Sequence, residues 1–243
     1  MVEVREDYIL VDGNRVAYTA AGGHGAPVVL VHGGASTRRD WAASIPVLAS
    51  VHRVYALDLP GYGESDNPEP VYTLRHMSDL LLGFIKEMRL ERVHLAGHSL
   101  GASAELEVAR LAPEAVARLV LVAPMGFGRM SLIGRGLATL AWAWDKGRRR
   151  PLPYPRLDIE LNDPNLDSLR TITAPTCLVW GERDRYFPVS QGKRAVELLP
   201  NARLKVFKGR GHAPHREEPA EFNRLVLDFF AADDGRAERR SAP

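Results

Sequence analysis

Short apolar runs alternate along the chain with segments whose apolar residues recur every three to four positions. The continuous runs predict buried strands, and the periodic segments predict helices. The predicted strands comprise residues 27–31, 53–57, 92–96, 119–123, 176–180 and 203–207. The predicted helices comprise residues 41–50, 74–88, 102–111, 191–199 and 217–230. Apolar strands that alternate with helices are typical of a parallel sheet covered on both faces.

The beginning of the chain has a different pattern. Residues 8–11 and 15–19 flank Asp12-Gly13-Asn14, a strong turn signal that predicts an antiparallel hairpin. The sequence therefore predicts an α/β fold with a mostly parallel central sheet of about eight strands, an N-terminal antiparallel hairpin and helices on both faces.

The alternation stops between residues 128 and 170. This segment contains one predicted helix (residues 132–144), then three consecutive arginines and a loop with three prolines. We expect residues 128–170 to form a short cap inserted into a core made of residues 1–127 and 171–232. The polar residues 233–243 are expected to be a disordered tail.

Composition indicates a soluble globular protein. The chain has 243 residues, of which 45% are hydrophobic and 26% charged, which suits one domain with a sizeable core. No apolar run is long enough to span a membrane, and the acidic N-terminus is unlike a signal peptide. Cys177 is the one cysteine, so no internal disulfide can form, and a reducing cytoplasm is expected. No Cys/His cluster has metal-ligand spacing, so no metal is expected.

The positive charge is concentrated in the predicted cap. Residues 128–157 contain seven basic side chains and one acid, a charge of about +6. Since the net charge of the chain is +2, the remainder carries about −4. These residues do not interleave with a nucleic-acid-binding module, and no nucleic-acid partner is expected. They could attract an anionic small-molecule substrate, coenzyme A, a carrier protein or an anionic membrane surface. The alternative is a solvated charged face. The oligomeric state cannot be read from the sequence.

Gly97-His98-Ser99-Leu100-Gly101 fits the G-x-S-x-G pattern of a nucleophile elbow. Small residues on both sides of the serine let the chain make a sharp strand-to-helix turn that exposes the hydroxyl. A predicted strand precedes the pattern and a predicted helix follows it, as the elbow requires. The alternative is a glycine-rich turn with a structural serine.

A nucleophilic serine needs a base, and the base needs an orienting group. Asp184 and His212 each follow a predicted strand, in the chain order serine, acid, histidine. Glu182 is the competing acid. The competing histidines are His215, expected at the surface or at a helix start, and His98, which the strand direction should point away from the serine.

The sequence resembles the α/β-hydrolase superfamily over about residues 8–230. The landmarks are His32-Gly33-Gly34, the segment from Asp58 to Asp66 (DLPGYGESD), the elbow, Gly181-Glu182-Arg183-Asp184 and Gly211-His212-Ala213-Pro214. The resemblance implies that Ser99 is the nucleophile, His212 the base and Asp184 the orienting acid. It implies an oxyanion hole made by the backbone N–H groups of Leu100 and Gly34, and it implies no cofactor.

The resemblance also suggests roles around the triad. His32 is expected to pack beneath the oxyanion loop, and Asp58 with Gly61 and Gly63 to fix a turn near the site. The candidate substrate-pocket residues are His32, Met125, Phe127 and Trp142. Relatives with an aspartate nucleophile are excluded, because the nucleophile position holds Ser99. Ala102 replaces a glycine that many relatives have.

The expected activity is that of a serine hydrolase. Its substrate would be an ester, thioester or lactone of a small to medium apolar acid, cleaved through an acyl-enzyme on Ser99. Two alternatives stay open. The same triad serves relatives that cleave carbon–carbon bonds, cyclise natural products or carry out other non-hydrolytic reactions, and some relatives with a complete triad act as ligand receptors.

Overall fold

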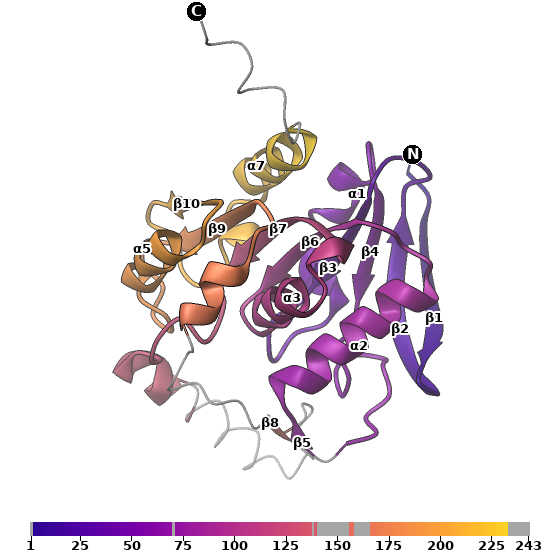
Figure 1. Cartoon of the computed structure of the whole chain (residues 1–243), viewed down its shortest axis with the longest axis horizontal. Helices are drawn as coiled ribbons and strands as arrows, with labels where there is room; N and C mark the ends of the chain where they lie inside the picture. The colour runs from indigo at the N-terminus through magenta and orange to yellow at the C-terminus, as the bar shows by residue number, and fades with distance from the viewer. Residues whose placement is uncertain (1, 70, 138, 140–155, 158–165, 233–243) are drawn as a thin grey trace, which may run out of the picture.

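The computed structural model describes residues 2–69, 71–137, 139, 156–157 and 166–232. Eight strands form the main sheet: β1 (Val4–Val11), β2 (Asn14–Ala21), β3 (Pro27–Val31), β4 (Arg53–Leu57), β6 (Val93–His98), β7 (Val116–Val122), β9 (Thr176–Gly181) and β10 (Ala202–Phe207). Their order in the sheet is β1-β2-β4-β3-β6-β7-β9-β10 (Figure 1). β1 and β2 are antiparallel to their neighbours, and the other six strands are parallel. The predicted α/β class, sheet and N-terminal hairpin are therefore confirmed.

The hairpin turn has the expected geometry. Val11 pairs with Asn14, so two residues connect the strands. Asp12 and Gly13 both have positive φ, 49° and 81°. A two-residue turn with this backbone matches the twist of the flanking strands.

Helices cover both faces of the sheet. The helical elements are η1 (Arg38–Trp41), α1 (Ile45–Leu48), α2 (Leu74–Glu87), α3 (Leu100–Leu111), η2 (Pro113–Ala115), η3 (Leu166–Thr171), α5 (Val189–Leu198), α6 (Pro214–Glu217) and α7 (Pro219–Ala231). Side chains of α2, α3 and α5 pack into the core on one face, and those of α1 and α7 into the core on the other. Figure 1 shows α2 and α3 together on the near face of the sheet, with α2 toward the side of β1 and β2.

The apolar runs correspond to strands buried on both faces. In β3, Val29 and Val31 face the core beneath α2 and α3, whereas Val28 and Leu30 face the core beneath α1 and α7. All four are fully buried. Successive side chains of a strand point to opposite faces, so a strand between two helical layers needs an apolar residue at each position.

Some elements differ from the sequence prediction. The predicted helix 41–50 is two short pieces, η1 and α1. The predicted helix 217–230 corresponds to α7, which begins only at Pro219, and the separate helix α6 ends at Glu217. Glu218 between them is not helical (φ −142°), because Pro219 offers no N–H and disfavours helical backbone before it. A two-stranded sheet of β5 (Val71–Tyr72) and β8 (Arg156–Leu157) was not predicted.

Parts of the predicted cap and tail cannot be compared with the structure. Residues 132–137 of the expected helix 132–144 are helical. The remainder of that helix apart from residue 139, the three-arginine run and residues 233–243 lie outside the described residues.

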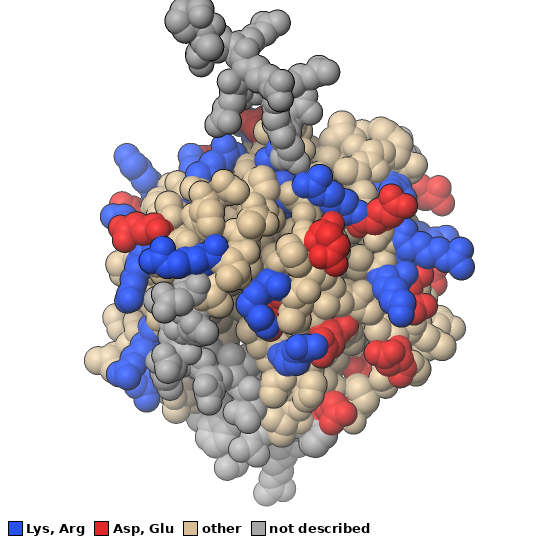
Figure 2. All heavy atoms as spheres, viewed as in Figure 1, with Lys and Arg blue, Asp and Glu red and all other residues tan. Residues whose placement is uncertain are grey.

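Figure 2 shows acidic and basic side chains interspersed over the face it displays. Within the described ranges, every helix is too short or too polar to span a bilayer.

A buried ion pair holds the loop after β4. The side chain of Asp58 is fully buried; it accepts hydrogen bonds from the backbone N–H groups of Arg38 (2.6 Å) and Glu64 (3.0 Å) and pairs with the Arg38 guanidinium. Gly63 has φ 54°, and a Cβ there would lie 2.1 Å from Asp58 Oδ2. Gly61 also has positive φ, 77°. Asp58 and the two glycines therefore fix a turn, as predicted.

Replacing Asp58 with alanine should lower the free energy of unfolding by about 3–5 kcal/mol, because the buried Arg38 guanidinium would lose its buried partner and keep only the exposed carboxylates of Glu64 and Glu6. Urea denaturation would measure this change. Asp79→Ala is the matched control: Asp79 pairs with Arg75 on the exposed face of α2 and should contribute less than about 1 kcal/mol. Equal losses in the two variants would contradict the role given to Asp58.

Helix α3 also buries a carboxyl group. Glu105 is completely inaccessible, and neither of its carboxyl oxygens has a hydrogen-bond partner among the described residues. Burial raises the pKa of Glu105 well above its usual value. Since the raised pKa belongs to the folded state, the associated stability is complete below the unfolded pKa of about 4.3 and is lost as the pH rises through the folded value.

Replacing Glu105 with methionine should therefore stabilise the protein at pH 8, by about 1–3 kcal/mol, because an unpaired polar group leaves the core. Urea denaturation at pH 5 and pH 8 should show that the parent loses stability over this range and the variant loses less. Glu107→Met on the same helix is the control, since Glu107 pairs with Arg110 at the surface. An identical pH dependence in parent and Glu105→Met would overturn this account.

Candidate active site

Ser99 occupies a strained turn between β6 and α3. Its backbone has φ 49° and ψ −111°, in the left-handed region that non-glycine residues rarely adopt. A Cβ on Gly97 would lie 2.6 Å from the Ala102 nitrogen, and one on Gly101 would lie 2.4 Å from the Val31 oxygen. Both glycines are therefore required by close backbone approach, as the elbow pattern predicts.

Hydrogen bonds hold this turn on both sides. The Ser99 N–H donates to the Val122 carbonyl at the end of β7 (2.8 Å). The Ser103 hydroxyl lies within hydrogen-bond distance of the carbonyls of Ser99 (3.0 Å) and Met125 (2.9 Å). The elbow is thus tied to its own helix and to the chain that leaves β7.

Asp184 and His212 come together from the loops after β9 and β10. The ring Nδ1 of His212 lies 2.7 Å from Asp184 Oδ2. The other carboxylate oxygen, Oδ1, accepts from the backbone N–H groups of Tyr186 (2.8 Å) and Phe187 (3.0 Å). The Asp184 side chain is fully buried, whereas that of His212 is 18% exposed. A carboxylate can only accept, so Nδ1 carries the ring proton and Nε2 keeps its lone pair.

The competing groups are engaged elsewhere. Glu182 is exposed and accepts from the Gly209 N–H (2.8 Å), so the structure pairs His212 with Asp184 and not with Glu182. His215 lies at the start of α6, one of the two positions expected for it, and its side chain is fully buried. It packs against Trp41, with ring centroids 4.6 Å apart.

Ser99 and His212 share no direct hydrogen bond, but His98 brings the segments that carry them into contact. The ring of His98, the residue before Ser99, contacts the ring of His212 at a centroid distance of 4.9 Å. Among the described residues, the Ser99 hydroxyl has no hydrogen-bond partner. Catalytic hydrogen bonds are often long in unliganded enzymes and tighten in the substrate complex.

The two expected oxyanion donors both have free N–H groups. Leu100 is the first residue of α3, where helical N–H groups lack intrahelical partners and the helix dipole favours negative charge. Gly34 lies in the exposed turn after β3. Neither backbone N–H has an acceptor within the part of the chain that the structure describes. Their role as oxyanion donors stays a prediction.

Two of the predicted pocket residues are not at a surface. His32 is fully buried; its Nδ1 lies 2.7 Å from the Gly33 carbonyl, and its Nε2 accepts from the Leu59 N–H (3.0 Å). Burial also lowers the pKa of His32. This neutral ring supports the loop after β3, as one expectation had it, and its place in a substrate pocket stays a prediction. Phe127 is also buried and packs against Trp180.

The pocket roles of the other two residues, Met125 and Trp142, stay predictions. Met125 is half-buried at the edge of the core beneath α3, and Trp142 lies outside the described residues. The beginning of the predicted cap lies against the Asp184 loop, because the Ser131 N–H donates to the Tyr186 carbonyl (2.8 Å).

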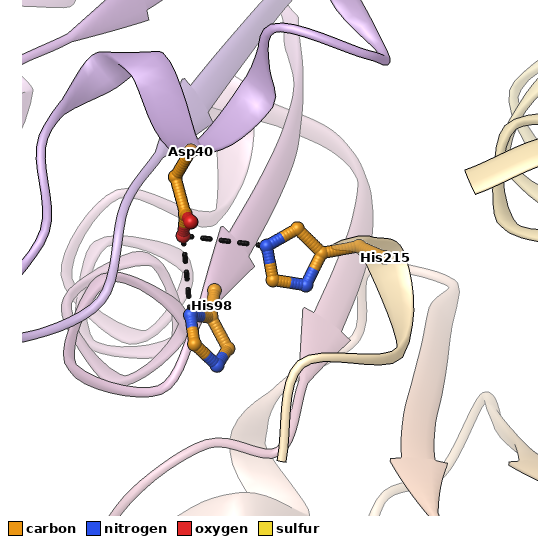
Figure 3. A group of neighbouring side chains, drawn as sticks. All are labelled: Asp40, His98 and His215. Atoms are coloured by element: carbon orange, nitrogen blue, oxygen red, sulfur yellow. Dashed lines mark hydrogen bonds and ion pairs between the residues drawn. The ribbon is translucent and has the colours of Figure 1, made fainter. Parts of the chain in front are cut away.

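Sequence analysis missed a buried cluster beside His212. Asp40 Oδ2 lies 3.3 Å from His98 Nδ1 and 3.3 Å from His215 Nε2 (Figure 3). Asp40, His98 and His215 come from η1, the end of β6 and α6, which are far apart along the chain, so no spacing pattern reveals them. One carboxylate oxygen and two ring nitrogens within 4.8 Å form a donor set of the kind that binds divalent cations.

Comparisons with known proteins agree with this geometry. The model of the alpha/beta hydrolase family matches residues 28–225. The 2-hydroxy-6-oxononadienedioate/2-hydroxy-6-oxononatrienedioate hydrolase 2 of Pseudomonas putida is 31% identical, over 86% of this chain and 89% of that protein. The dihydrolipoyllysine-residue acetyltransferase component of the acetoin cleaving system of the same species is 30% identical over 90% of this chain. This chain spans about two thirds (68%) of that component.

Two solved structures are similar over nearly the whole chain. The meta-cleavage product hydrolase CumD of Pseudomonas fluorescens IP01 superposes with a TM-score of 0.77 at 26% identity, over 92% of this chain and 97% of CumD. The carboxylesterase CesB of Bacillus subtilis superposes with a TM-score of 0.80 at 25% identity, over 94% of this chain and 92% of CesB. The match to the family model, together with the strained serine turn and the Asp184–His212 pair, establishes that this chain belongs to the alpha/beta hydrolase family.

Proposed function

We propose that the protein is a serine hydrolase that cleaves an ester, thioester or lactone bond of a small to medium apolar substrate through an acyl-enzyme on Ser99. The observation that carries the proposal is the Asp184–His212 hydrogen bond at the same edge of the sheet as the strained Ser99 turn. The similarity to a carboxylesterase and to meta-cleavage product hydrolases supports a hydrolase.

Acylation begins with His212 as the base. Because its Nδ1–H donates to Asp184, its Nε2 can take the Ser99 hydroxyl proton while Oγ attacks the substrate carbonyl carbon. The tetrahedral oxyanion accepts hydrogen bonds from the N–H groups of Leu100 and Gly34. When the intermediate collapses, the leaving alcohol or thiol takes the proton from His212, and the acyl group stays on Ser99.

Deacylation repeats these steps with water. His212 removes a proton from a water molecule, which attacks the acyl carbon, and the same two N–H groups stabilise the second oxyanion. Collapse of this intermediate releases the carboxylic acid and returns the proton to Ser99. Asp184, fixed by the backbone of Tyr186 and Phe187, keeps the ring oriented through both halves of the reaction.

We infer that residues 128–170 form a cap that shapes the substrate pocket. Two contacts support this: the Ser131 N–H bonds to Tyr186, next to the acid, and the Gln191 side-chain amide donates to the Arg129 carbonyl (2.8 Å). The positive charge of the segment favours an anionic or carrier-bound substrate.

Carbon–carbon bond hydrolysis is the second candidate. It is favoured by the similarity to the dienedioate hydrolase and to CumD, which is named a meta-cleavage product hydrolase. The same serine, histidine and acid would serve, and the leaving group would be a carbanion in place of an alkoxide. A ligand receptor with a retained triad would instead show tight binding and slow turnover.

A fluorophosphonate should label Ser99 stoichiometrically, as read by intact mass and peptide mapping. Ser99→Ala should abolish labelling and lower kcat for short p-nitrophenyl esters by about 10⁴-fold or more. Ser50→Ala, at an exposed position beyond α1, is the control. Turnover of a meta-cleavage product without ester turnover would favour carbon–carbon bond hydrolysis over ester hydrolysis. Ester hydrolysis that survives in Ser99→Ala would contradict both proposed activities.

The two candidate acids can be separated by a matched pair of variants. Asp184→Asn should lower kcat by about 10⁴-fold, because the amide favours the wrong tautomer of His212. Glu182→Gln should leave kcat near that of the parent, since its carboxylate bonds only to the Gly209 backbone among the described residues. A larger loss in Glu182→Gln than in Asp184→Asn would reverse the assignment.

A further inference from the structure

Three segments that carry the proposed catalytic groups meet at Asp40. This residue belongs to η1, which follows the loop that carries Gly34 (the oxyanion loop, residues 33–37), and its side chain is 1% exposed. Its Oδ2 contacts His98, the neighbour of the proposed nucleophile, and accepts from His215 (3.3 Å) on the segment that carries His212, here called the histidine loop (residues 209–216) (Figure 3). Its Oδ1 accepts from the Arg216 guanidinium on the same loop (3.0 Å).

His98 links the elbow directly to the proposed base. Its Nε2 lies 3.1 Å from the backbone carbonyl of His212. A carbonyl can only accept, so Nε2 carries a proton and donates. Burial lowers the pKa of His98 to about 3, so the ring is neutral at physiological pH and Nε2 holds its single proton.

The His98 ring is clamped on its other sides. Its Nδ1 lies 3.3 Å from Asp40 Oδ2 without hydrogen-bond alignment. A Cβ on Gly33 would lie 2.7 Å from Nδ1, so the oxyanion loop packs directly on the ring. The rings of His212 and His215 lie at centroid distances of 4.9 and 4.6 Å. The ring therefore has little freedom to turn away from the His212 carbonyl.

The contacts of His98 bear on the separation between Ser99, the proposed nucleophile, and His212, the proposed base. Ser99 and His212 come from different loops and have no direct hydrogen bond. The bond from His98 to the His212 carbonyl joins these two loops one residue away from Ser99. We propose that His98 is a positioning residue that sets the separation of Ser99 and His212, with Asp40 anchoring the histidine loop through His215 and Arg216.

The same side chains could instead hold a divalent cation. Two neutral rings and one carboxylate are suitable ligands. The Arg216 guanidinium, however, already neutralises the Asp40 carboxylate, which lowers its attraction for a metal ion. The cluster is therefore better explained as a hydrogen-bonded anchor, and measurement of bound metal distinguishes the two explanations.

The test compares two substitutions of His98. In His98→Gln, the amide nitrogen is as many bonds from the backbone as Nε2, so it can still donate to the His212 carbonyl. In His98→Asn, the nitrogen corresponds to Nδ1 and cannot reach. His98→Asn should lower kcat and the rate of fluorophosphonate labelling by about 10- to 100-fold, the loss expected when a reacting group is misplaced by about 1 Å. KM should change little, and His98→Gln should recover most of the rate.

Hydrogen exchange gives a readout that does not need catalysis. His98→Asn should raise amide exchange in residues 209–216, whereas His98→Gln should not. Asp40→Asn should raise exchange in the same residues, and the effects of the two Asn substitutions on labelling should be less than additive because both act through one loop. His52→Asn is the control for loss of a buried histidine, since His52 lies before β4, at the opposite end of the strands.

The outcomes of these experiments either support or overturn the positioning role of His98. The rate measurements rest on the proposed function, whereas the exchange measurements do not. If the parent labels at Ser99 but His98→Asn labels equally fast, His98 does not position the base, although the hydrolase proposal stands. If the parent neither labels nor turns over esters, the hydrolase proposal fails, and exchange in residues 209–216 alone decides the anchoring. Unchanged exchange in His98→Asn, or a stoichiometric metal ion that Asp40→Asn loses, would overturn the anchor.

Discussion

The backbone turn at Ser99 is the constraint on which the site depends. A non-glycine residue at φ 49° and ψ −111° costs of the order of 1–3 kcal/mol, so surrounding contacts must hold it. Bonds from Ser99 N–H to Val122 and from Ser103 to the Ser99 carbonyl do so. The turn also needs α3 to pass within touching distance of the end of β3, which only glycine at position 101 permits.

The parallel sheet then determines what surrounds this turn. From β3 the chain passes to β4 on one side and later to β6 on the other, so the ends of β3 and β6 are adjacent. Ligands bind in open α/β sheets at such a reversal of strand order, beyond the carboxyl ends of the strands. The loop that carries Gly34 follows β3 and Ser99 follows β6, while Asp184 and His212 follow β9 and β10 at the same edge. Local strain and sheet topology together assemble the proposed machinery.

Sequence patterns predict those parts of the structure that local physics determines. Strands buried on both faces appear as apolar runs, and the elbow appears as spaced glycines. Contacts between distant segments carry no such signal. Asp40 joins η1 to the histidine loop through His215, and the place of His215 at a helix start does not reveal that its side chain is buried. The helical periodicity of residues 102–111 likewise gives no sign that the charged side chain of Glu105 is buried. Pro219 separates α6 from α7, although the predicted helix 217–230 ran through this position.

A crystal structure of the fluorophosphonate adduct would test the account most directly. The account predicts a phosphorus–oxygen bond to Ser99 Oγ, with the phosphoryl oxygen about 2.7–3.1 Å from the backbone nitrogens of both Leu100 and Gly34. His212 should keep its bond to Asp184 and direct Nε2 toward the adduct. Phosphonate attached to another residue, or a phosphoryl oxygen that faces away from both N–H groups, would contradict the proposed catalytic site.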